Sequence, residues 1–244
     1  MRKVALMMAL ALPAGAEDLT RQIISLSETK TVETAAPGAA RSAIRFETSR
    51  GGVSIEGWDK PQVEITILKS TTGLFDPKQH DEATRLLNAT QVSAEPMNDA
   101  IVISTKIPEH DRKYVRVEYA IKAPRGMKIE VGNHAEGDLS FSGMSGDIEA
   151  TTRHGQITLD LPGNERYSID AHTRYGDVYS DFQGQDRRRR LFHHDFTAGV
   201  SSSDTAPGGT TAGAEHKLLL RAEIGDIVIL KDFAVPVETA ADTK

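Results

Sequence analysis

The 244-residue sequence contains no cysteine and few aromatic side chains, which make up 5% of its residues. Without cysteine, it forms neither a disulfide framework nor a cysteine-ligated zinc site. A chain of this size buries roughly 70% of its unfolded surface, so it can build a core without such cross-links. Length and composition therefore predict one domain, or two small ones, with a thin aliphatic core.

The sequence also lacks an excess of positive charge and, beyond its first residues, any long apolar run. It has 29 basic and 35 acidic residues and a formal net charge of -6. Because binding to a phosphate backbone needs clustered positive charge, no nucleic-acid partner is expected. No apolar run approaches the roughly 20 residues that span a bilayer, so no transmembrane segment is expected.

The first residues have the pattern of a secretory signal peptide. Arg2 and Lys3 precede an uncharged apolar stretch, and small residues follow at Ala14 and Ala16. Such a positive, then apolar, then small-residue order is typical of a cleaved export signal. We expect residues 1–16 to be removed and the protein to be periplasmic or secreted.

Strict alternation of apolar and polar residues dominates the rest of the chain. Val63, Ile65 and Ile67 alternate with polar neighbours, and the same pattern recurs at 115–121, 127–131 and 101–103. Alternation with period two is typical of strands that bury one face. Many short strands separated by Gly, Pro and Asp turns predict an all-β fold.

A single helix is predicted over about 76–88. Asp76 can cap it, Pro77 suits its first position, and Gln79 stands where a capping-box partner would. Ala83 and Leu87 belong to a one-sided apolar stripe, which favours a helix lying on the core.

The second half of the chain contains an internal repeat. Glycine followed by Asp or Gln and an apolar residue recurs at Gly137, Gly155, Gly176 and Gly225, with an echo at Gly52. Glycine permits the positive φ of a sharp corner, and stacked repeats bury a shared interior. The repeat predicts stacked strand pairs in which apolar residues form columns: Leu139, Ile157 and Val178, and likewise Ala150 and Ala171.

These residues resemble a known family over roughly 42–230, namely bacterial exported "putative adhesin" proteins, also described as toast-rack proteins, of unknown function. The resemblance rests on the early Gly52-to-Gly57 step, the helix after a strand, the Pro-Arg-Gly turn at 124–126 and the Gly-Asp-apolar repeats. It implies a right-handed β-solenoid of short stacked strands. The family has no agreed catalytic residues, so the resemblance implies no catalytic site, cofactor or metal.

The expected domain organisation follows from these patterns. Residues 17–41 form an N-terminal strand or lead-in, and residues 42–240 form the repeat domain. An insertion at about 183–216 interrupts the repeat, and its part from about Thr197 to Ala214 is rich in Ser, Thr, Gly and Ala. That composition is typical of a flexible loop.

The insertion also carries the sharpest candidate binding residues, which combine positive charge with aromatic and imidazole side chains. They are Arg187, Arg188, Arg189, Arg190, Phe192, His193 and His194. Guanidinium groups bind phosphate and carboxylate groups, so an envelope polyanion or a partner protein is a candidate ligand. The alternative is an exposed charged strand or loop.

Metal sites are less well supported by the spacing. His193, His194 and Asp195 offer zinc-type ligands, but adjacent residues of a strand point to opposite faces. Asp138 and Asp147 are spaced as in calcium-binding repeats, but Gln156 stands where the next carboxylate belongs. We therefore expect no metal, and we interpret the Asp residues as turn caps. His134, His154 and His172 occupy different places in their repeats and are expected to be rim residues.

Two functions remain open at this point. The favoured one is a non-enzymatic exported β-solenoid with a binding or scaffold role at the cell envelope. The alternative is a carbohydrate-active β-helix enzyme, either a lyase or a hydrolase. A hydrolase needs two carboxylates about 5 to 10 Å apart, and Glu149, Asp160 and Asp170 are expected to face outward.

Overall fold

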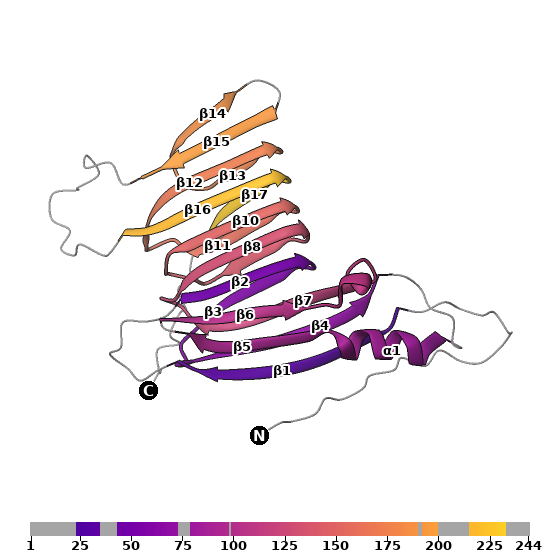
Figure 1. Ribbon diagram of the computed structural model, residues 1–244. Helices are drawn as coiled ribbons and strands as arrows, with labels where there is room; N and C mark the ends of the chain where they lie inside the picture. Colours follow the sequence, from indigo (N-terminus) through magenta and orange to yellow (C-terminus); the bar gives the residue numbers. More distant parts are fainter. Residues whose placement is uncertain are drawn as a thin grey trace, which may run out of the picture.

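The computed structural model describes residues 23–34, 43–72, 79–97, 99–189, 192–199 and 215–232, and for Ser49 and Arg189 the backbone alone. These residues form two β-sheets in a tall stack, with one α-helix near its N-terminal end (Figure 1). The segment 1–16, the pair at 76–77 and Arg190 lie outside the described residues.

Strands from all parts of the chain contribute to both sheets. The 8-stranded sheet has the order β1-β4-β7-β3-β9-β11-β17-β13. Its strands are β1 Ser25–Glu33, β4 Gln62–Thr71, β7 Val115–Pro124, β3 Val53–Trp58, β9 Leu139–Ser142, β11 Ile157–Pro162, β17 Ile227–Asp232 and β13 Val178–Ser180. The 9-stranded sheet has the order β14-β15-β12-β16-β10-β8-β2-β6-β5. Its strands are β14 Gln185–Arg189, β15 His193–Ala198, β12 Arg166–Tyr175, β16 Glu215–Ile224, β10 Ile148–His154, β8 Lys128–Glu136, β2 Ala43–Arg50, β6 Ala100–Lys106 and β5 Gln91–Met97.

The middle of the stack consists of rungs, each of which contributes one strand to either sheet. Their spatial order is β2–β3, β8–β9, β10–β11, β16–β17 and β12–β13, and neighbouring rungs pair in parallel. This arrangement confirms the predicted β-solenoid-like stack. The last rung in the sequence, β16–β17, is inserted between two earlier ones, as the yellow strands of Figure 1 show.

This insertion corrects the predicted apolar columns. Leu139 lies beside Ile157 as expected, but Ile227 separates Ile157 from Val178. In the other sheet Leu220 separates two alanines, at 150 and 171. All rungs carry the same inward-facing pattern, so the pattern predicts which residues are buried but not the order of the rungs. Each fully buried aliphatic side chain contributes roughly 1.5–3 kcal/mol.

A column of glycines turns the chain from one sheet to the other. The first corner is Gly51, with φ 125°, and not the expected Gly52. A Cβ on Gly155 would lie 2.2 Å from the carbonyl oxygen of Gly137, and one on Gly225 would lie 2.0 Å from that of Gly155. The corners therefore approach too closely for any side chain.

The N-terminal end of the stack is antiparallel and partly covered by a helix. Here β1, β4 and β7 pair antiparallel, as do β5 and β6. The helix α1 spans His80–Ala89 and buries Ala83 and Leu87. Its N-cap is Gln79, and Asp81 and Glu82 lie in its first turn, where carboxylates interact well with a helix N-terminus. The predicted start at about residue 76 lies outside the described residues.

The opposite end is covered by β14 and β15, which lie within the expected insertion. The two strands pair antiparallel, and β15 pairs antiparallel with β12. Phe196 and Ala198 are buried on β15, beside β12 of the outermost rung. Thr197 and Ala198, expected in a flexible loop, therefore belong to a strand, and residues 200–214 lie outside the described part. No helix in the described residues is long and apolar enough to cross a membrane.

Candidate functional site

An open polar groove of about 380 Å³ lies on the outward face of the 9-stranded sheet, near its β14 end. The side chains that line it come from β12, β14, β15 and β16. They are Asp170, His172, Gln185, Arg187, Asp195, Thr197 and Arg221.

Strand alternation and register bring these residues together. On β12, Asp170 and His172 face outward because Ile169 and Ala171 are buried. Pairing places Arg221 on one side of His172 and Asp195 on the other. Arg187 stands opposite Asp195 in the next strand. The groove thus contains a cross-strand row in the order Arg221, His172, Asp195 and Arg187.

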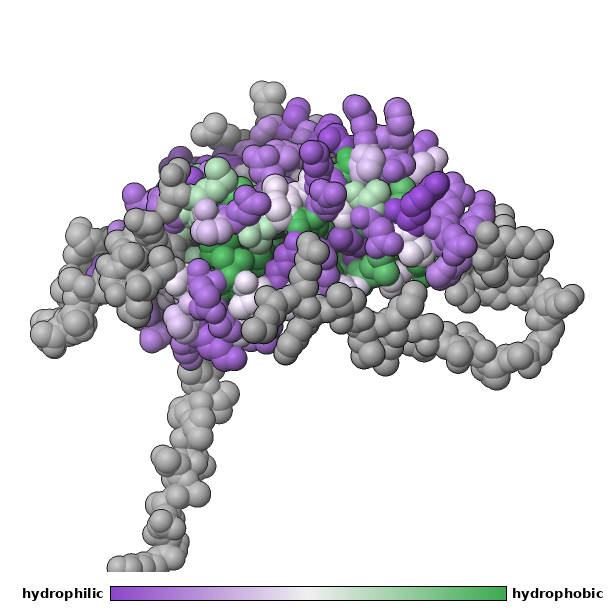
Figure 2. All heavy atoms as spheres, turned by 60° about the horizontal axis from the view of Figure 1, so that its bottom comes forward, coloured by the Kyte–Doolittle hydropathy of each residue, from purple (hydrophilic) through white to green (hydrophobic). Residues whose placement is uncertain are grey.

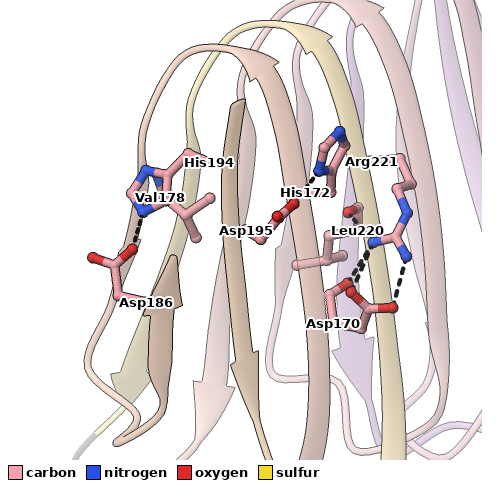
Figure 3. Close-up of polar contacts among 8 residues, drawn as sticks. All are labelled: Asp170, His172, Val178, Asp186, His194, Asp195, Leu220 and Arg221. Atoms are coloured by element: carbon pink, nitrogen blue, oxygen red, sulfur yellow. Dashed lines mark hydrogen bonds and ion pairs between the residues drawn. The ribbon is translucent and has the colours of Figure 1, made fainter. Parts of the chain in front are cut away.

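Arg221 and Asp170 form the most extensive contact in the groove. The two guanidinium NH groups of Arg221 lie 2.6 and 3.2 Å from the carboxylate oxygens of Asp170, and Nη1 also donates to the Asp170 carbonyl (Figure 3). A further bond from Nη1 reaches the Leu220 carbonyl at 3.0 Å. Such a two-pronged pair fixes both side chains, so Arg221 is held rather than free.

His172 is held by the carboxylate of Asp195. Its Nδ1 hydrogen-bonds to Oδ1 of Asp195, as the dashed line in Figure 3 marks. About a third of each side chain is exposed, 35% for His172 and 29% for Asp195. A carboxylate on one ring nitrogen orients the ring, which leaves Nε2 to meet a ligand.

Arg187 differs from the other charged groups of the groove. It donates to Oε1 of Gln185 at 3.1 Å, and no carboxylate of the described residues lies within ion-pair distance of it. Two other cations on this face share one carboxylate. Arg45 and Lys128 both contact Glu130, at 2.7 and 2.6 Å. The hydrogen bond from Lys128, followed by that from Arg45, lowers the pKa of Glu130.

The other residues predicted from the insertion are divided by strand alternation. Arg188 lies on the opposite face of β14 from Arg187 and contacts Asp177 at 2.7 Å. Arg189 ends β14, where only its backbone is described, and Arg190 lies outside the described residues. Phe192 is exposed and packs edge-on against Tyr175, with ring centroids 5.6 Å apart.

The two histidines point to opposite sides of β15, as strand geometry predicts. His193 is exposed, whereas His194 is only 3% exposed. The backbone N–H of Val178 donates to Nδ1 of His194, so Nε2 carries the proton and donates to Asp186 (Figure 3). Both ring nitrogens of His194 are engaged inside the protein, and His194 therefore joins the end of the stack to β14.

The aspartates that follow the corner glycines act as turn caps. Oδ1 of Asp138 accepts the backbone N–H of Gln156, and Oδ1 of Asp147 accepts that of Lys217, both at 2.8 Å. These bonds join neighbouring rungs, as the turn-capping interpretation predicts. In the described part of the chain, no three His, Asp or Glu side chains are close enough to hold a metal ion.

The remaining expected polar residues are scattered over the surface. His134 is exposed near Glu47, and Nδ1 of His154 contacts the carbonyl of Ala135. His172 lies in mid-strand rather than at a rim, because β12 continues to Tyr175. Glu149 on β10 and Asp160 on β11 belong to different sheets, whereas Glu149 and Asp170 lie in one row of the 9-stranded sheet with Leu219 of β16 between them.

Three groove residues were missed by the sequence analysis: Gln185, Thr197 and Arg221. Arg221 is distant in sequence from β12 and reaches Asp170 only because β16 is inserted beside that strand. Its outward position was readable, since it alternates with Leu220 and Ala222. The strand that lies beside it could not be predicted from the sequence.

Solved structures similar to the chain include a "putative cell adhesion protein" from Clostridium sporogenes, with TM-score 0.47, 12% identity and coverage of 86% of this chain and 100% of that one. A "putative adhesin" from Bacteroides fragilis has TM-score 0.31 and 10% identity, and covers 87% of this chain and 99% of that one.

No curated protein matches the sequence. The sequence profile named Toastrack DUF4097 matches residues 42–229, which include strands of every rung. The chain therefore belongs to the Toastrack DUF4097 family.

Proposed function

We propose that the protein is an exported, non-enzymatic binding protein of the cell envelope, and that its groove holds an acidic glycan. The observation that carries this proposal is Arg187, a groove cation without a carboxylate partner in the described part of the protein. An anionic group of the ligand would supply the ionic partner that Arg187 lacks among the described residues. Guanidinium groups bind carboxylate, sulfate and phosphate through paired hydrogen bonds.

The rest of the groove suits the hydroxyl groups of a sugar chain. Gln185 and Thr197 offer amide and hydroxyl groups. The groove is open rather than enclosed, which suits a segment of an extended polymer more than a small buried ligand. Export is supported by the signal-peptide pattern of residues 1–16.

The carboxylates of the groove offer less to the enzyme alternative. Asp170 is held by Arg221, and Asp195 by His172. A glycoside hydrolase needs one carboxyl group that donates a proton to the leaving group and a second that faces it across the scissile bond. Two carboxylates already held by Arg221 and His172 do not supply that pair.

The proposal is tested by measuring binding of the purified protein to polygalacturonate, with neutral dextran as the uncharged comparison. Arg187→Ala is expected to weaken binding about tenfold, which corresponds to about 1.4 kcal/mol. Arg188→Ala is the matched control, because this neighbouring cation lies on the opposite face of β14 and contacts Asp177. Binding should fall with added salt, since exposed charges are screened.

Three results would count against the proposal. Equal binding by wild type and Arg187→Ala would remove the role of Arg187, and equal binding of dextran would remove the role of charge. Release of reducing ends from the glycan by the wild-type protein would favour the carbohydrate-active enzyme instead.

A further inference from the structure

Strand β1 is an edge strand with an unusually open edge. It spans nine residues, Ser25–Glu33, and pairs on one side with β4. The other sheet edges are protected in ways that proteins commonly use against association. Strand β13 is three residues long, β14 carries consecutive arginines, and β5 contains Pro96. Strand β1 contains neither proline nor glycine, and its inner charges, Glu28 and Lys30, are of opposite sign and so do not repel a second copy as the arginines of β14 would.

The free backbone groups of β1 belong to alternate residues. The carbonyl of Ile24 accepts the N–H of Thr71 at 3.0 Å, and the N–H of Ile24 donates to Oγ1 of Thr71. In an antiparallel pair every second residue bonds to the same neighbour. The even-numbered residues of β1 therefore bond toward β4, and the odd-numbered ones direct their N–H and C=O groups to the open edge, with Thr29 at the centre.

We propose that this edge pairs with the same edge of a second copy of the chain, antiparallel and about a two-fold axis through Thr29. The sequence of β1 is self-complementary in that register. Leu26 of one copy lies opposite Val32 of the other, and Glu28 lies opposite Lys30. These are an apolar pair and an oppositely charged pair, both of which stabilise antiparallel strands. Two-fold pairing forms each contact twice and closes the assembly as a dimer.

Charge also selects the register. A shift that moves the axis by one residue toward the N-terminus places Glu28 opposite Glu28, and the opposite shift places Lys30 opposite Lys30. Like charges directly opposite each other destabilise a strand pair. The register centred on Thr29 also pairs the whole strand, whereas every shift shortens it.

The side chains on the inner side of β1 have apolar surface left to bury. Leu26 and Val32 pack against the core but are only partly buried. Figure 2, which turns this end of the stack toward the viewer, shows apolar (green) atoms uncovered among polar ones. The side chain of Glu28 is 38% exposed beside Lys69. The amine of Lys30 contacts the Val92 carbonyl within its own chain, and its remaining N–H groups would reach Glu28 of the second copy.

Cross-linking tests both the contact and its register. Because the chain has no cysteine, Thr29→Cys introduces a single thiol that meets its copy on the two-fold axis. Directly opposite, hydrogen-bonded residues have Cα atoms about 5.5 Å apart, within disulfide range. Mild oxidation is expected to give a covalent dimer of Thr29→Cys on a non-reducing gel. Ser27→Cys should give no covalent dimer on the same gel, because the two introduced thiols lie on either side of the axis and too far apart to form a disulfide.

Sedimentation of the purified protein tests the contact without cross-linking. The wild type is expected to dimerise increasingly as its concentration is raised to about 100 µM, which detects a dimer whose Kd is of that order or lower. Thr29→Lys should weaken dimerisation at least tenfold, since it sets like charges together on the axis. Ser54→Lys is the matched control, because Ser54 is exposed on the same sheet, in the row that joins Thr29, Thr66 and Ala120.

The proposal is overturned if the wild type sediments as a monomer throughout this range, if Ser54→Lys weakens association as much as Thr29→Lys, or if Thr29→Cys and Ser27→Cys cross-link equally.

Discussion

Single residues at the corners decide how closely the rungs approach. At Gly155 the carbonyl of Gly137 occupies the place of a side chain, 2.2 Å from an ideal Cβ. The aspartate after a corner then accepts a backbone N–H of the next rung, as Asp226 does from Asp177 at 2.8 Å. A glycine and a carboxylate in sequence thus provide both the close approach and the bond that fixes it.

Gly155→Ala is expected to destabilise the fold by roughly 2 kcal/mol or more, because φ at this position is 144° and the new methyl group would meet a backbone carbonyl. Urea unfolding followed by circular dichroism measures the effect. The control is Gly126→Ala, in a turn where nothing lies within 4 Å of an added Cβ. A midpoint for Gly155→Ala equal to that of the control would contradict the close-approach argument.

Much at this scale was predictable from the sequence. Ile65 and Ile157 are buried as their alternation predicts, and Asp138 caps a turn. The groove was not predictable, because Asp170 and Arg221 belong to strands that are distant in sequence and whose pairing no local pattern encodes. Local chemistry predicts which way a side chain points, whereas a site depends on which strand lies beside it.

Among the elements, the β14–β15 pair closes the end of the stack through one buried histidine. His194 accepts the N–H of Val178, at the start of β13, and donates to Asp186 on β14. It therefore connects both sheets at this end. Phe196 adds apolar contact beside it, but the outer strand β14 has no neighbour beyond it among the described strands.

His194→Leu keeps the volume of the side chain and removes both hydrogen bonds. The N–H of Val178 then loses its partner, which costs about 1–3 kcal/mol for a buried group. Amide hydrogen exchange is expected to speed up in β13, β14 and β15, while β8 and β10 keep their protection, because local opening need not disturb distant rungs. Thr197→Val, on the exposed side of β15, is the control.

If His194→Leu and Thr197→Val exchange alike, the histidine does not fasten the end of the stack. The sequence analysis placed the two histidines on opposite faces of a strand, and that is confirmed. It did not predict the partners of His194, because Val178 and Asp186 belong to β13 and β14, whose positions beside β15 no local pattern encodes.

The whole molecule is a stack whose spatial order differs from its sequence order. Removal of the last repeat of a sequential solenoid leaves its other repeats in contact, since each repeat touches only its neighbours. Here β16 separates β10 from β12, and β17 separates β11 from β13. The last repeat is therefore internal, which repeat matching alone does not reveal.

A chain that stops at residue 214 is expected to lose cooperative unfolding and not merely to shorten. It lacks β16–β17, so the two rungs on either side lose their shared partner and much of their buried surface. Thermal unfolding by circular dichroism, with size-exclusion chromatography, measures this. A chain that stops at Asp232 keeps every described strand and should unfold as the full chain does. A cooperative transition in the shorter chain would contradict the expectation.

The inserted rung also constrains the order in which the protein can fold. Whether the chain emerges from the ribosome or from an export channel, β12, β13, β14 and β15 emerge before β16 and β17, the strands beside which β12 and β13 pair. Until then, the newly made C-terminal half exposes bare strand edges and an uncovered apolar face, the features that folding helpers recognise and that invite aggregation. Folding of this half must therefore wait until β16 and β17 have emerged. A chain that ends before them leaves the edges of β12 and β13 without their partners.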